Sequence, residues 1–221
     1  FCLGLSYVAI TIRQLSSTEP VWLIGLFFSI AILIIGVFSF FIEEFENPSS
    51  FLISKYVSDL SGHSICATIE GIRPMLIEVQ ALVSSAVYGT PQRSSTGFEN
   101  KRLNMLLAIL EKRAGFQLGA KDVFLNLAGG IRLVDPGIDL AVIVAILSSS
   151  LDISVPRGYI FAAEIGLSGE LRNVPKIEQR IQEASKQGFE KMVVAKTVKP
   201  VTNKIQLVQL SSVKELVQHL F

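Results

Sequence analysis

Residues 135–148 read DPGIDLAVIVAILS, and this stretch decides how the rest of the chain must pack. Asp135 followed by Pro136 is a start signal for a helix, because aspartate caps free N–H groups and proline fits the first turn. The segment that follows is apolar on almost every side. A helix without a polar face has to be covered all round, so we expect a central, buried helix that ends near Ser148.

Shorter patterned segments surround this helix. Alternating apolar and polar residues predict strands, and leucines at helical spacing before Gly115 predict a helix. Because the strands and helices do not alternate strictly, we expect one α+β domain. The expected strands are two within 64–83, then 121–127, 159–165, 169–173, 191–195 and 205–210. The expected helices are 100–113, 135–148, 175–186 and 212–220.

The segment 84–97 is rich in Ser, Thr, Gly and Pro, with Arg93 in its middle. This composition predicts a loop. A loop of this length inside a compact domain is often functional.

The amino-terminal part has a different composition. Residues 21–42 contain no charged side chain over 22 positions, and about 20 apolar residues span a bilayer as a helix. We therefore divide the chain into an apolar segment 1–42, a linker 43–62 and a folded domain 63–221. The apolar segment is either a transmembrane helix or a non-native insertion, and a chain that begins with Phe1 is expected to be a fragment.

Composition and motifs exclude several classes of function. The chain has 20 Lys and Arg against 19 Asp and Glu, so any binding to nucleic acid needs a local basic patch. No Walker motif occurs, the two cysteines form no C-x-x-C pair, and His63 and His219 stand far apart. We therefore expect no metal site and no cofactor in this chain. Asp135 and Asp139 are interpreted as capping and helix-dipole partners rather than as an acid pair.

Several stretches resemble the carboxyl-terminal domain of the RadA (Sms) DNA-repair family. The resemblance covers roughly 45–197, and it rests on FENPSSF, ATIEGIRPMLIEVQALV, GFENKRLNMLLAILEKRAG, DVFLNLAGGIRLVDPGIDLAV, EIGLSGELR and EQRIQEASKQGF. It implies a fold similar to domain 2 of ribosomal protein S5 and to the Lon peptidase domain. The apolar residues before position 35 do not resemble the family, which favours an insertion such as a translated intron over a membrane helix.

The resemblance also implies a function for the parent protein. That family combines a zinc finger, a RecA-like DNA-dependent ATPase and this domain, and it drives branch migration as a hexameric ring. The implied partners are single-stranded or branched DNA, a recombinase filament and further copies of the chain. Zinc and ATP would bind only to the parts that this chain lacks. The implied location is the cytoplasm or an organellar matrix, plastid or mitochondrion, unless 21–42 is a membrane helix.

Lon peptidases use a serine activated by a lysine, and the resemblance places those two positions at Gly137 and Glu178. Glycine has no side chain to attack a peptide, and a carboxylate does not replace an amine. We therefore expect that this chain is not an enzyme. A Ser-Lys peptidase and a membrane-anchored interaction protein remain the alternative functions.

Without peptidase chemistry, the domain is expected to act through its surface, in oligomerisation and DNA contact. Lysine and arginine neutralise phosphates without reading sequence. Arg93 and Arg102 are the preferred DNA contacts. The complete candidate set is Arg93, Lys101, Arg102, Lys112 and Arg113.

Overall fold

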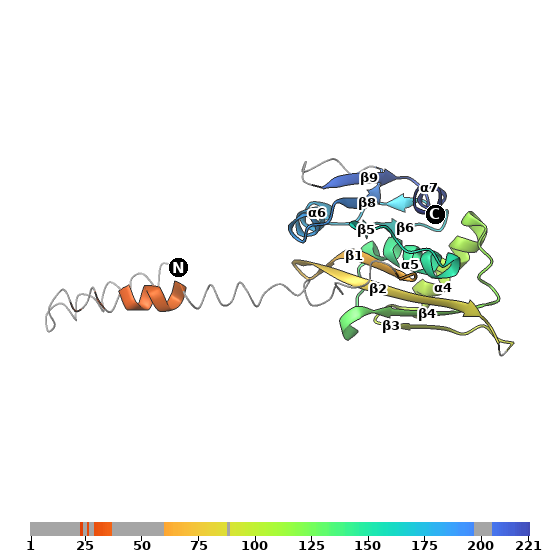
Figure 1. The fold of residues 1–221 in the computed structure, drawn as a ribbon, viewed down its shortest axis with the longest axis horizontal. Coiled ribbons are helices and arrows are strands. Elements are labelled where there is room, and N and C mark those ends of the chain that lie inside the picture. The colour runs from red at the N-terminus through yellow and green to blue at the C-terminus, as the bar shows by residue number, and fades with distance from the viewer. Residues whose placement is uncertain (1–22, 24–25, 27–28, 37–59, 88, 197–204) are drawn as a thin grey trace. The chain divides into compact units, whose positions relative to one another are not determined.

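A hairpin of two long strands forms the centre of the domain in the computed structural model (Figure 1). The structure describes residues 23, 26, 29–36, 60–87, 89–196 and 205–221. The chain divides into two units, 1–47 and 48–221. The strands are β1 (His63–Glu70), β2 (Arg73–Ser85), β3 (Arg93–Thr96), β4 (Lys121–Leu127), β5 (Tyr159–Ala162), β6 (Glu164–Ile165), β7 (Leu171–Arg172), β8 (Lys191–Ala195) and β9 (Gln206–Leu210). The helices are α4 (Asn100–Ile109), α5 (Asp139–Leu151), α6 (Ile177–Lys186) and α7 (Val213–Leu220), with short turns η2 (Leu110–Ala114), η3 (Ala128–Gly130) and η4 (Pro136–Ile138).

Seven strands form one sheet in the order β3-β4-β2-β1-β5-β8-β9, and β6 pairs with β7 in a separate two-stranded sheet. β2 runs antiparallel to both β1 and β4, whereas the other neighbouring pairs of the large sheet are parallel. The expected mixture of helices and strands is confirmed. The α+β class is only partly right, because the sheet is mostly parallel. A parallel pair needs a crossover, and α6 supplies one between β5 and β8.

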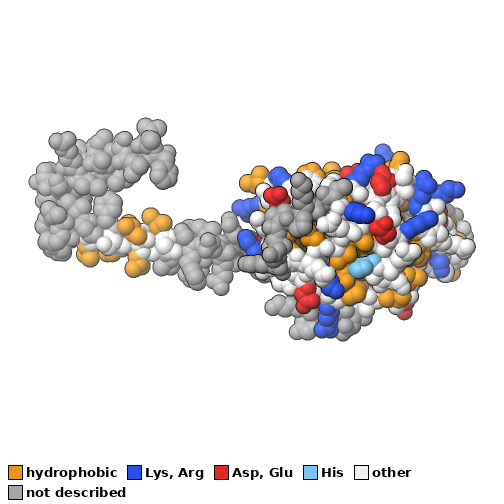
Figure 2. All heavy atoms as spheres, turned by 90° about the horizontal axis from the view of Figure 1, so that it is seen from above, with side chains coloured by type: hydrophobic (Ala, Val, Ile, Leu, Met, Phe, Trp, Pro, Cys, Tyr) orange, Lys and Arg blue, Asp and Glu red, His pale blue; other side chains and the backbone are white. Residues whose placement is uncertain are grey.

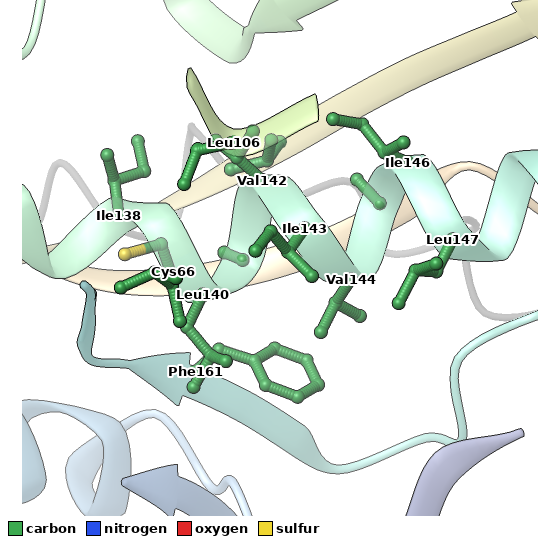
Figure 3. Packing of buried hydrophobic residues seen from close by; sticks show 14 of the residues in the cluster. Cys66, Leu106, Ile138, Leu140, Val142, Ile143, Val144, Ile146, Leu147 and Phe161 are labelled. Carbon is green, nitrogen blue, oxygen red and sulfur yellow. The ribbon is translucent and has the colours of Figure 1, made fainter. Parts of the chain in front are cut away.

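Two apolar clusters lie on the two faces of the sheet, because successive side chains of a strand point to opposite sides. Cys66 and Ile77 belong to the cluster around α5, and their neighbours Ala67 and Leu76 belong to the cluster around α6. Helix α5 is buried from Asp139 to Ser148, as the all-round apolar pattern predicts. Figure 3 shows its side chains packed between Leu106 of α4 and Phe161 of β5.

Two local expectations need correction. The predicted loop 84–97 contains β3, a short polar strand that pairs in parallel with β4. The predicted strand 159–165 divides into β5 and β6 at Ala163. This residue exchanges backbone hydrogen bonds with the start of α5, donating to Gly137 and accepting from Leu140, both at 3.2 Å. The division brings β5, the β6–β7 hairpin and the α5 turn together.

The amino-terminal unit is described only in part. Residues 29–36 are helical, and Ile32 and Leu33 are among its exposed apolar side chains. Within the described residues, none of the helices combines the length and apolar character that a membrane span requires. The predicted linker 43–62 lies mostly outside the described residues, as do many positions of the predicted span 21–42. The proposed boundaries at 42 and 62 stay predictions.

Candidate functional site

The turn that starts α5 is held by the side chain of Asp135. Its carboxylate accepts hydrogen bonds from the backbone N–H of Gly137 at 3.0 Å and from the N–H of Ile69 at 3.1 Å. The hydroxyl of Thr68 donates to the same carboxylate at 2.7 Å. The capping role that the sequence predicts for Asp135 is confirmed, and the cap also ties α5 to β1.

Arg180 of α6 neutralises this buried carboxylate. Its guanidinium donates to both carboxylate oxygens of Asp135, at 2.5 and 2.9 Å, and to the backbone oxygen of Ala67 at 2.7 Å. The side chains of Arg180 and Asp135 are only 2% and 8% exposed. Burial alone would raise the pKa of Asp135, but the hydrogen bonds and charge of Arg180 hold it below the ordinary value.

Gly137, which the resemblance places at the position of a peptidase nucleophile, lies directly against this ion pair. A Cβ atom built on Gly137 would stand 2.7 Å from Nη1 of Arg180, closer than van der Waals contact permits. The side chain from α6 that approaches Gly137 is therefore Arg180. Glu178, which the resemblance places opposite the nucleophile, is exposed on the same helix. Arg180 stands two positions after Glu178 and fills the space beside Gly137, and the assignment of Glu178 to the peptidase lysine position stays a prediction.

A second Arg-Asp pair closes the other side of the turn. Arg102 of α4 donates to both carboxylate oxygens of Asp139, with Nε at 3.0 Å from Oδ1, and to the backbone oxygen of Ile165 at 2.7 Å. Asp139 is 1% exposed and also accepts from the N–H of Ile165 at 3.2 Å. Burial raises the pKa of Asp139 above its ordinary value, against the opposing effect of Arg102. This pairing gives Arg102 a structural role that the sequence pattern does not indicate.

The side chains around Gly137 offer little nucleophilic chemistry. The thiol of Cys66 is fully buried and donates to the backbone oxygen of Gly137 at 3.6 Å, and burial strongly raises its pKa. A thiol without thiolate character is a poor nucleophile. The adjacent hollow of about 430 Å³ has no Ser, Thr, Cys or His among its described lining residues. We find no group of three His, Cys, Asp or Glu within the described ranges that could hold a metal ion.

The other predicted DNA contacts lie on the surface. Lys101 is exposed on α4, and Lys112 and Arg113 are exposed in η2, a π-helical turn that continues α4. Arg93 on β3 is half-buried, and its guanidinium donates to the side chain of Asn104 at 3.4 Å. None of these four forms an ion pair in the part of the chain that the structure describes. On the face shown in Figure 2, basic side chains lie in several places between acidic and apolar ones.

Sequence reasoning missed two residues of the turn, Arg180 and Thr68. Both are distant in sequence from Asp135, and neither carries a local signal. The available signal was indirect: two aspartates that open a fully apolar helix will be buried, and a buried carboxylate needs a cationic or hydrogen-bonding partner.

Comparisons with known proteins support the resemblance to the RadA family and match a second family description. Residues 77–198 match the family described as subunit ChlI of Mg-chelatase. DNA repair protein RadA of Bacillus subtilis is 42% identical over 153 residues, which cover 69% of this chain and 33% of that protein. RadA of Streptococcus pneumoniae is 42% identical over 181 residues, 80% of this chain and 43% of that protein. RadA of Aquifex aeolicus is 39% identical over 180 residues, 81% of this chain and 40% of that protein.

These matches correct the expectation that the chain is not an enzyme. The matched family is named for a subunit of an enzyme, and together with the RadA relatives it points to an ATPase family. The expectation failed because it rested on motifs absent from this chain, while the chain spans only about a third to two fifths of the curated relatives it matches. The resemblance to RadA is confirmed, and the chain belongs to the family described as subunit ChlI of Mg-chelatase.

Proposed function

We propose that residues 63–221 form a DNA-contacting and self-associating part of a RadA-type repair ATPase that drives branch migration. The proposal rests on a basic row, formed by the exposed side chains of Lys101 on α4 and of Lys112 and Arg113 in η2. These side chains form no ion pair within the described residues. Phosphates would supply the missing negative charge. The RadA relatives support a role in DNA repair for the parent protein.

The shape of the helix suits this contact. Lys101 and Lys112 stand 11 residues apart, which corresponds to about 16 Å along a helix axis. The π-helical turn ends at Ala114, and Gly115, with a φ of 80°, caps it shortly after Lys112 and Arg113. The basic row therefore has one charge near the start of the helix and two at its end, so it could reach well-separated phosphates of a nucleic-acid backbone. Contact of this kind is salt-dependent and largely independent of sequence.

The proposal also assigns this domain to the fold of ribosomal protein S5 domain 2 and of the Lon peptidase domain. The serine-lysine dyad of the peptidase is absent from the proposed positions, Gly137 and Glu178. Gly137 offers no nucleophile, and Arg180 fills the space beside it through its bonds to Asp135. Arginine keeps its proton at all physiological pH values, so it does not serve as the general base. The turn thus supports the fold rather than peptide cleavage.

The remaining parts of the proposal concern the whole protein. ATP and zinc would bind outside this chain, and the partners would be single-stranded or branched DNA and a recombinase filament. Assembly would produce a hexamer in the cytoplasm or an organellar matrix. A ring multiplies the basic row around one strand, so the affinity for DNA should rise with oligomerisation.

A salt titration of fluorescent single-stranded DNA tests the proposal. The variant Lys101→Ala/Lys112→Ala/Arg113→Ala should bind more weakly to every sequence. For each phosphate that is no longer neutralised, the slope of log K against log salt should become shallower by about 0.7 for a single strand. The charge-matched control Lys186→Ala/Lys196→Ala/Lys214→Ala changes three lysines that are exposed elsewhere in the domain. Equal slopes and affinities for the two triple variants would exclude the α4–η2 row as a DNA contact.

A further inference from the structure

Within the described residues, one part of the large sheet has no covering helix on one face. Helices α4 and α5 pack on the first face, and α6 packs on the second face over β1, β2 and β5. Among the described elements, none covers the second face over β3, β4 and the end of β2. Phe124 and Leu82 stand there with 37% and 60% of their surfaces exposed.

The strand register arranges this face in two rows. Gln80 of β2 lies between His63 of β1 and Asn126 of β4, and Thr96 of β3 continues the row. In the neighbouring row, Phe124 pairs with Leu82 on one side and with Ser94 on the other. A polar row thus runs beside an apolar row that contains an aromatic ring.

A chain of hydrogen bonds orders the polar row. Glu78, which is only 3% exposed, accepts from Nε2 of Gln80 and contacts Nδ1 of His63, both at 2.8 Å. The side-chain carbonyl of Gln80 then accepts from Nδ2 of Asn126 at 3.2 Å. This chain fixes the amide of Asn126 so that its nitrogen points to Gln80.

Three polar groups near Phe124 remain available to bind a ligand. The carbonyl oxygen of Asn126 and the hydroxyls of Ser94 and Thr96 accept or donate no hydrogen bond within the described ranges. They line a hollow of about 470 Å³ together with Phe124 and Leu82. The hollow therefore offers hydrogen-bond donors and acceptors next to a partly exposed aromatic ring, which suits a planar ligand with polar edges.

The charges around the hollow indicate which planar ligand fits. Its described lining contains no Lys, Arg, Asp or Glu. The edge strand β3 carries Ser94 into the hollow, while its neighbour Arg93 points to α4 and Asn104. A ligand that fits both places has an uncharged ring, which lies in the hollow, and a negatively charged group, which lies on the other side of β3 near Arg93. Nucleotides of a single strand carry both features.

We propose that this hollow binds an unpaired nucleobase, which stacks on Phe124 and meets Asn126, Ser94 and Thr96 with its polar edge. This inference rests on the proposed DNA contact, because the phosphates of the same strand would run over β3 toward Arg93 and Lys101. Sheet faces with an exposed aromatic ring bind single strands in this way, and base pairing hides the base in a duplex.

The test uses the 221-residue chain and compares an oligothymidine of about 12 nucleotides, within the site size of one such domain, with a duplex of the same length. Phe124→Ala should weaken single-strand binding by about tenfold, which matches the usual contribution of one stacked base. It should leave duplex binding and the salt slope unchanged, because the ring touches no phosphate. Phe124→Trp should restore the affinity. Leu151→Ala is the matched control, since Leu151 is 40% exposed at the far end of α5.

The outcomes separate this inference from the proposed function. Unchanged single-strand affinity for Phe124→Ala, together with weakened binding by the basic triple variant, would overturn the nucleobase site alone. Weaker binding by Phe124→Ala with no effect of the triple variant would overturn the basic row and support the hollow. Circular dichroism of each variant, with the wild-type spectrum expected, confirms that weaker binding does not come from unfolding.

Discussion

The turn before α5 and the surface of α4 both carry basic residues, but they use them differently. At the turn, Arg180 and Arg102 are each matched to one buried aspartate by two or more hydrogen bonds. On α4, Lys101 stands beside Arg102 in the sequence, yet it is exposed and forms no ion pair with the described residues. The burial of the partner, rather than position in the sequence, therefore decides whether a basic side chain supports the fold or remains available for binding.

Removal of Arg180 should have the largest effect on stability. Arg180→Ala leaves Asp135 charged and buried, and breaking one side of a buried pair costs about 3–5 kcal/mol of unfolding free energy. Urea denaturation measures the decrease. The control Arg172→Ala removes an arginine whose side chain is 56% exposed next to Glu170, and an exposed pair contributes about 0–1 kcal/mol. Equal decreases for the two variants would show that burial does not distinguish the pairs.

Gly137→Ser tests whether the turn has room for a nucleophile. The new side chain would press on Nη1 of Arg180, which is held by Asp135 and by the backbone oxygen of Ala67. Overpacking of this kind costs about 1–3 kcal/mol. We expect a lower denaturation midpoint and no cleavage of casein or fluorogenic peptides. Serine-dependent cleavage by this variant would mean that the turn keeps a general base within reach.

A fall in pH should lower the unfolding free energy through protonation of Asp135. A lowered pKa in the folded state means that the Asp135 carboxylate stabilises the fold at pH values above its unfolded pKa, about 3.9. That contribution disappears as the pH falls through the folded pKa. The wild type should therefore be more stable than Asp135→Asn at about pH 7, and the difference should shrink below about pH 4. Urea denaturation between these pH values measures it, and a constant difference would contradict the assigned pKa direction.

The features of the fold that could be predicted depend on neighbours in the sequence. The buried helix α5 and the cap at Asp135 follow from residues that touch within one or two turns. The strand β3 could not be predicted, because a short run of polar residues forms a strand only when β4 is beside it. The mostly parallel sheet could not be predicted for the same reason, since crossovers pair segments that are distant in the sequence.

The candidate site shows the same limit. The helix start around Gly137 could be predicted from the turn itself, whereas the residue that contacts Gly137 depends on how α6 docks on the sheet. That docking places Arg180, and not Glu178, against the turn. The basic residues were all visible in the sequence, whereas the pairing of Arg102 with the buried Asp139 was not. The polar and apolar rows beside the hollow could not be predicted from the sequence, because each strand contributes only one or two residues to them.

The smallest expected effect on stability separates two adjacent residues of α4. Lys101→Ala removes an exposed charge without a partner among the described residues, so the unfolding free energy should change by less than about 0.5 kcal/mol. Its salt slope for single-stranded DNA should become shallower by about 0.7, the share of one phosphate. Arg102→Ala should show the reverse, a clear drop in stability with an unchanged slope, because its guanidinium is occupied by Asp139 and the backbone of Ile165. Urea denaturation and salt titration of both variants decide the matter. If Arg102→Ala also lowered the slope in a chain that remains folded, the pair with Asp139 would have to open when DNA binds, and the two regions would not be separate.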